Sequence, residues 1–98
     1  MAGLNYLLKK IENKIMVNME DLLSRITINP RMMVGKPTIR GMRITVEQIL
    51  LALSGGVSEQ ELLINEYPEL EKEDFQAVFA YVTKLVEEEQ VFPAEIPH

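Results

Sequence analysis

Residues 45–60 read TVEQILLALSGGVSEQ, a stretch with clear signals for where helices start and stop. Thr45 and Gln48 have the spacing of a capping box, in which each side chain bonds a free backbone N–H group at a helix start. The apolar residues that follow recur at three- and four-residue steps, and Gly55-Gly56 can take the left-handed conformation that ends a helix. The stretch therefore predicts one complete helix, with a second capping box beginning at Ser58.

Two more helices are predicted downstream of this stretch. The first stops at Tyr67-Pro68, because proline disfavours helical geometry in the residue before it. The second spans residues 72–89 and has the strongest periodic signal in the sequence. Its apolar face consists of Phe75, Val78, Phe79, Val82, Leu85 and Val86. Three short helices joined by tight turns match a helix-turn-helix unit, and they also match any other three-helix bundle.

The sequence changes character upstream of the first quoted helix. Ile26-Thr27-Ile28 and Thr38-Ile39-Arg40 favour extended structure, while Pro30 and Pro37 exclude a long helix. We therefore expect short strands joined by turns over this segment.

An amphipathic helix is predicted nearer the N-terminus, over residues 3–16. Its apolar stripe consists of Leu4, Leu7, Leu8, Ile11 and Ile15. Asn18 has the side chain of an N-cap residue, which predicts a separate short turn over residues 19–23.

Together these signals predict a mainly α fold with a short β segment. We expect an N-terminal helical extension over residues 1–24, strands and turns over 25–44, three helices over 45–90 and a tail over 91–98. The chain has 98 residues, 47% of them apolar, which is enough for one packed core. It has no cysteine and no apolar run long enough to cross a membrane, so we expect a cytoplasmic protein without an export signal.

The charges are unevenly distributed along the chain. The formal net charge is −5, and residues 47–98 hold two lysines against twelve acidic residues. Residues 22–46 contain five cations and no acid: Arg25, Arg31, Lys36, Arg40 and Arg43. Five cations on an extended segment can contact the phosphates of DNA. They can equally pair with the acids of the C-terminal half, and the sequence leaves both interpretations open.

The sequence offers few residues for catalysis. Its only histidine is His98 and it lacks cysteine, so metal sites and nucleophile–base pairs lack their usual side chains. Glu71, Glu73 and Asp74 form an acidic cluster, but acids at the start of a helix are stabilised by its dipole and by solvent. We expect no enzyme activity, no cofactor and no metal site.

Four short elements resemble one bacterial family. They are Ile26-Thr-Ile-Asn-Pro30, Gly35-Lys-Pro-Thr-Ile-Arg-Gly-Met-Arg-Ile-Thr-Val46, Gly56-Val-Ser58 and Tyr67-Pro68. In this order they resemble the domain of unknown function family 433, whose members are often described as VapB-like antitoxins. The resemblance covers residues 26–86 and implies a homeodomain-like helix-turn-helix domain after an extended segment. It also implies the antitoxin role in a toxin–antitoxin pair.

Three positions depart from the family pattern. Val34 replaces a common glycine, Met42 a common threonine, and Glu71 a threonine that often begins the last helix. The last change weakens an N-cap and adds a negative charge at the helix start. Because a polyphosphate repels acids, this helix is a poor candidate for the DNA groove, and the basic segment over residues 25–43 is the better one.

Two apolar segments suit a protein partner. The tail carries Val91, Phe92 and Ile96 between prolines, and it either packs along a groove or frays. The stripe of the N-terminal helix either packs on the domain or pairs with a second copy, so we expect a homodimer. The leading hypothesis is a dimeric antitoxin-like protein that binds a cognate toxin and contacts operator DNA. The alternative is a protein–protein interaction or dimerisation module with no nucleic-acid role.

Overall fold

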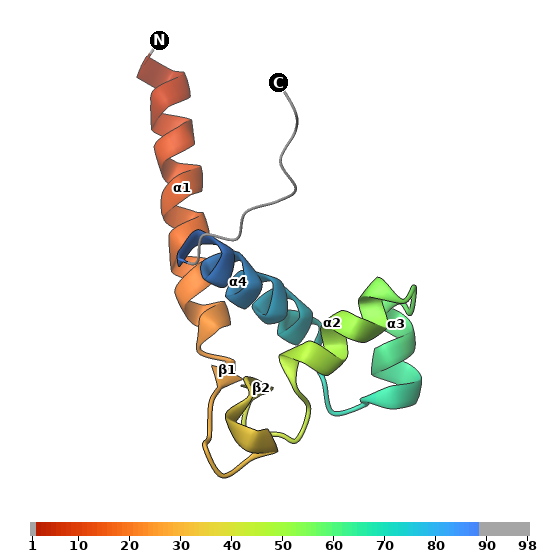
Figure 1. Ribbon diagram of the computed structural model, residues 1–98. Helices are drawn as coiled ribbons and strands as arrows, with labels where there is room; N and C mark the ends of the chain where they lie inside the picture. The colour runs from red at the N-terminus through yellow and green to blue at the C-terminus, as the bar shows by residue number, and fades with distance from the viewer. Residues whose placement is uncertain (1, 89–98) are drawn as a thin grey trace, which may run out of the picture.

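The computed structural model describes residues 2–88, with the side chains of residues 3–11 and 18–88 (Figure 1). It is mainly helical with one two-stranded antiparallel sheet, as the sequence predicts. The elements in chain order are α1 (Ala2–Leu23), β1 (Ile26–Thr27), the 3-10 turn η1 (Met33–Gly35), β2 (Thr38–Ile39), α2 (Val46–Ser54), α3 (Glu59–Glu61), the π-helical turn η2 (Leu62–Glu66) and α4 (Lys72–Glu88). Within residues 2–88, no helix is long and apolar enough to cross a membrane.

Both ends of α2 are where the sequence predicts them. Thr45 Oγ1 accepts the N–H of Gln48 at 3.0 Å, and Gln48 Oε1 accepts the N–H of Thr45 at 2.9 Å. At the other end, the left-handed residue is Gly56, with φ at +95°. Only glycine adopts that conformation without steric cost, so local sequence is sufficient to end this helix.

The helix predicted after Ser58 is only partly regular. Ser58 Oγ accepts the N–H of Glu61 at 3.0 Å, which is one of the two bonds of a capping box. The chain then widens into η2, where the N–H of Tyr67 donates to the carbonyl of Leu62 at 2.7 Å. This wider turn ends at Tyr67, which Pro68 holds outside the helical region at φ −131°.

The first helix, α1, is longer than predicted. It runs without a break from Ala2 to Leu23, so Asn18 lies inside the helix and caps no separate turn. The continuation has a tertiary cause, because Met19, Leu22 and Leu23 are partly buried where α1 packs on α4. The N-terminal half of α1 projects beyond α4 (Figure 1).

The core lies between the small sheet and the three C-terminal helical segments. The strands pair Ile26 with Ile39 and Thr27 with Thr38. The buried apolar cluster consists of Ile39, Ile44, Val46, Ile49, Leu62, Leu70, Phe75 and Val78. Three residues of the predicted apolar face of α4 are nevertheless exposed: Phe79, Leu85 and Val86. The periodicity of this helix therefore overestimates how much of it the core covers.

The turn η1 holds a strained residue, Val34. Its backbone is left-handed, with φ at 57° and ψ at 33°, and its side chain is 94% exposed. This conformation costs a residue with a Cβ about 1–2 kcal/mol, and branching at Cβ makes it rarer still. The resembled family commonly has glycine at this position, which adopts the conformation freely.

Replacing Val34 with glycine should raise the free energy of unfolding by about 0.5–1 kcal/mol, because the strain relieved exceeds the entropy cost of ordering glycine. Urea denaturation followed by circular dichroism measures the change. Val34→Ala is the matched control, since it shortens the side chain but keeps a Cβ at positive φ. The alanine variant should gain less than the glycine variant, and a destabilised Val34→Gly protein would contradict the strain.

Candidate functional site

Asp74, in the first turn of α4, is fully buried at 0% exposure. Its Oδ1 accepts hydrogen bonds from Arg25 Nη1 and from Arg40 Nε, both at 3.0 Å. Its Oδ2 accepts from Arg40 Nη2 at 2.9 Å and from the backbone N–H of Glu71 at 2.7 Å. Both carboxylate oxygens are therefore occupied, which is the condition for keeping a charge inside a protein.

Three segments that are far apart in the sequence meet at this carboxylate. Arg25 lies between α1 and β1, Arg40 directly follows β2, and Asp74 belongs to α4. Arg40 and Gly41 both have positive φ, at 45° and 73°, as in a type I′ hairpin turn. The backbone N–H of Arg40 donates to the carbonyl of Arg25 at 2.7 Å, which holds the two arginines side by side.

Glu71 completes the group at the protein surface. Its Oε2 lies 3.1 Å from Arg25 Nη1, and its Oε1 lies 3.8 Å from Arg40 Nη1. We call Arg25, Arg40, Glu71 and Asp74 the ion cluster. The backbone N–H of Asp74 donates to the carbonyl of Glu71 at 3.0 Å, so the side chain of Glu71 is not needed to cap it and binds the arginines.

The surroundings of Asp74 keep it ionised. Burial raises its pKa, but hydrogen bonds from Arg40, from the N–H of Glu71 and from Arg25 outweigh that effect, and the pKa lies below its ordinary value of 3.8. Hydrogen bonds to Asp74 in turn raise the pKa of Arg25 and of Arg40. A carboxylate in this state holds the three segments together and has no proton to exchange near neutral pH.

The structure brings together only two of the five basic residues predicted to contact DNA. Arg25 and Arg40 belong to the ion cluster. Lys36 Nζ lies 3.1 Å from Glu47 Oε2 in an exposed pair. Arg31 and Arg43 are exposed, and neither is in an ion pair among the described residues. Pairing with C-terminal acids, one of the two interpretations left open by the sequence, thus accounts for three of the five cations.

Other predicted site residues lie elsewhere. The tail residues Val91, Phe92 and Ile96 are outside the described part of the chain. Within residues 2–88, no group of three His, Cys, Asp or Glu side chains is arranged to hold a metal ion. Asp74 is buried, whereas its place in an acidic cluster at the helix start predicts an exposed side chain. The signal that could have found it was its position three residues after Glu71, where a capping box has its acid.

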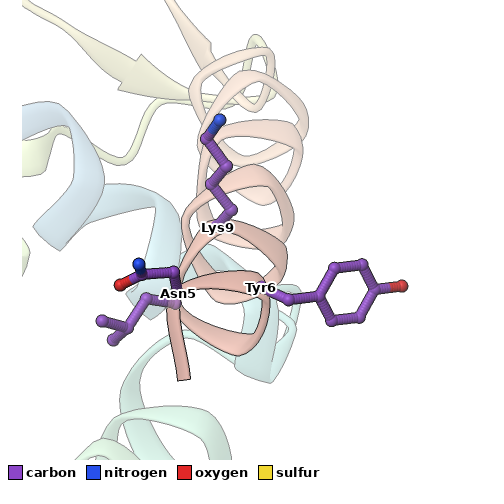
Figure 2. A pocket seen from close by; sticks show the side chains of 4 residues that line it. Asn5, Tyr6 and Lys9 are labelled. Carbon is purple, nitrogen blue, oxygen red and sulfur yellow. The ribbon is translucent and has the colours of Figure 1, made fainter. Parts of the chain in front are cut away.

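A second notable surface covers the first turns of α1. Its large apolar side chains are 49% to 67% exposed: Leu4, Tyr6, Leu7, Leu8 and Ile11. A hollow here is lined by Asn5, Tyr6, Leu8 and Lys9, all from α1, and Figure 2 shows Asn5 and Tyr6 pointing to opposite sides of the helix. Without a second element as its wall, this is the open surface of a helix and not a ligand pocket. We call residues 3–11 the exposed half of α1.

Comparisons with known proteins identify similar chains. The sequence profile of a family described as proteins of unknown function (DUF433) matches residues 26–82. The fold resembles the crystal structure of a DUF433 member protein from Anabaena variabilis ATCC 29413, with a TM-score of 0.60 and 29% sequence identity. That match covers 81% of this chain and 77% of the other chain. No curated protein matches.

Asp74→Asn should lower the free energy of unfolding by about 2–4 kcal/mol, because both arginines lose the charge that compensates them. The loss stays toward the lower end of the range for broken buried pairs because Arg25 and Arg40 keep some contact with water. Glu47→Gln, which breaks the exposed pair with Lys36, is the matched control and should cost less than about 1 kcal/mol. If Asp74→Asn and Glu47→Gln lower the free energy of unfolding equally in urea denaturation, the ion cluster does not have a central role.

The same comparison should depend on pH. Because folding lowers the pKa of Asp74, its ionised form stabilises the fold above the unfolded value of 3.8. That contribution is lost as the pH falls through the lower, folded pKa. The stability difference between the wild type and Asp74→Asn should therefore narrow as the pH is lowered from about 7 to about 2. A difference that stays constant over this range would show that Asp74 is not the titrating group.

Proposed function

We propose that this chain, which belongs to the DUF433 family of proteins of unknown function, is a binding protein that engages another protein through the exposed half of α1. The observation that carries the proposal is the exposure of five large apolar side chains within residues 3–11. Four of them, Leu4, Leu7, Leu8 and Ile11, lie on one side of the helix, and contiguous apolar surface of this kind marks interaction sites on soluble proteins. Residues 25–88, which we call the core domain, hold the helix in place.

The exposed half of α1 suits recognition in a groove. Leu4, Leu8 and Ile11 follow one another at steps of four and three residues, so they share one face of the helix. An amphipathic helix with this spacing is a recurring way to occupy a hydrophobic groove on a partner. The C-terminal half of α1 packs on α4, so the exposed half is held at a defined angle before any partner arrives.

The dimensions of the protein agree with a projecting helix. The radius of gyration is 16.7 Å. A compact domain of this length has a radius of about 13 Å. The larger radius of gyration means that this chain leaves exposed some surface that a compact fold would bury.

The specific form of the proposal is an antitoxin-like protein that acts in the cytoplasm and binds a cognate toxin. The resemblance of residues 26–86 to VapB-like antitoxins supports this role. The homeodomain-like helix-turn-helix arrangement belongs to the same proposal, with α2, then α3 and η2, then α4 as its three helices. The geometry argues most directly for a protein partner at α1, whether or not that partner is the toxin.

A photocrosslinking residue at position 8 tests the proposal in cells. We expect Leu8→p-benzoylphenylalanine to yield a discrete protein adduct, because the exposed half of α1 is covered by a partner. Ile64→p-benzoylphenylalanine on η2 is the matched control, since Ile64 is also an exposed apolar residue. Mass spectrometry of the adduct identifies the partner, and a toxin would establish the antitoxin role. The proposal would be contradicted if position 8 gave no adducts, or only the same adducts as position 64.

DNA contact is a second candidate function. It is favoured by Arg31 and Arg43, which are exposed and outside the ion pairs of the described residues. The first turn of α4 is unsuited to the same task, because Glu71 and Asp74 are bound to arginines and Glu73 adds a negative charge. Any phosphate contact within residues 25–43 would therefore rest on two free cations instead of five.

The salt dependence of DNA binding reports how many of these cations contact phosphates. Fluorescence anisotropy with a duplex from the gene's own upstream region should give a slope of log affinity against log salt no steeper than about −2 per bound chain, because each chain neutralises two phosphates. A slope near −4 to −5 per bound chain would mean that all five cations engage and that the ion pairs open on DNA. No binding at low salt would eliminate the DNA function and leave the protein-binding one.

A further inference from the structure

We propose that the occupant of the exposed half of α1 is a second copy of this chain, bound antiparallel with residues 8–23 of the two α1 helices side by side. This inference rests on the proposed function, in which α1 is the contact element, and it names the partner. It is carried by the charges of α1, by the course of its apolar stripe and by the length of the helix.

The acids at the C-terminal end of α1 are placed against its own dipole. Glu20 and Asp21 lie in the last turn, where the dipole favours cations, and α1 has no basic residue there. Lys9 and Lys10 lie in its N-terminal half, and all four of these side chains are exposed. The helix dipole therefore gives no reason for the two acids.

An antiparallel second copy does give a reason. Lys10 and Asp21 are eleven residues apart, which is about three turns, so they lie on the same side of the helix, beside the apolar stripe. Lys9 and Glu20 have the same spacing but lie on the side of α1 away from that stripe. In an antiparallel pair centred between residues 15 and 16, Lys10 of one copy lies opposite Asp21 of the other, and symmetry repeats the contact. A parallel pair would instead place like charges side by side.

The apolar stripe of α1 supports the same antiparallel arrangement. Leu4, Leu8 and Ile11 lie on the side of α1 that carries Leu22, which is partly buried near α4. In the antiparallel pair, the exposed half of one copy would therefore contact the other copy at the place where its α1 packs on α4.

A hollow of about 300 Å³ lies at this junction, lined by Asn18, Asp21, Leu22, Arg25, Glu73 and Gln76. Two of these side chains are acids and one is a cation, and Arg25 is already bound to Asp74 and Glu71. The hollow therefore has the charge to receive Lys10 of a second copy.

Helix length favours an overlap longer than the exposed half of α1. Residues 8–23 span about 24 Å, whereas residues 3–11 alone span about 13 Å. A stable interface buries roughly 1,200–2,000 Å² in total, so it needs contact beyond the short segment, including the flank of α4. The antiparallel pair over residues 8–23 adds that contact and matches the charges in one arrangement.

Charge reversal tests the pairing on the full chain. Sedimentation equilibrium should show wild-type dimers of the 11.2 kDa chain. Lys10→Glu, and separately Asp21→Lys, should each weaken the dimer by about tenfold at low salt. The variant with both changes should recover dimers, because opposite charges again face each other. Glu59→Lys with Glu61→Lys, on exposed residues of α3, is the matched control and should leave the dimer unchanged.

Several outcomes would overturn the inference. They are a monomeric wild type, a folded two-change variant that does not recover, and mixed dimers of that variant with the wild type, which only parallel pairing allows. Circular dichroism melting of each variant shows that a loss of dimers is not a loss of folding. A monomer whose position-8 crosslink joins residues 89–98 of its own chain would also overturn it. If position 8 instead captures a different protein, the proposed function holds and the second copy is excluded.

Discussion

The buried carboxylate of Asp74 is the interaction on which the rest of the fold depends. Arg25 and Arg40 reach it from the ends of α1 and β2, so one side chain of α4 connects both strands and the N-terminal helix to the core. The sheet itself has only two residues in each strand, which is too little to be stable alone. Hydrogen-bonded charges therefore supply an alignment that the strand pairing cannot.

Features set by neighbouring residues could be predicted from the sequence, and features set by distant ones could not. The capping residues Thr45 and Ser58 and the stop before Pro68 act within one turn, and all lie where the sequence predicts. The unbroken course of α1 through Asn18 depends on packing against α4, which no local pattern contains. The burial of Asp74 depends on two arginines more than thirty residues away in sequence.

Charge pairing at the candidate site also depends on distant residues and could not be predicted from the sequence. The five cations of residues 25–43 form one basic segment in the sequence, but folding separates them into two that bind Asp74, one that binds Glu47, and two that bind no acid of the described chain. The summed charge of this segment therefore overstates the number of free cations that a polyanion could contact. The apolar stripe at the N-terminus was visible in the sequence, whereas only the structure shows that its first turns lie beyond the reach of α4.

The short connection between α1 and β1 has a mechanical consequence. Only Ser24 and Arg25 separate the helix from the strand, and Arg25 is fastened to Asp74. The helix therefore joins the fold without a flexible linker, because its C-terminal half packs on α4 and its end is fastened by this salt bridge. The exposed half is a lever arm about 13 Å long, and a load applied at Leu4 would be borne by α4 and by the arginine that aligns the sheet.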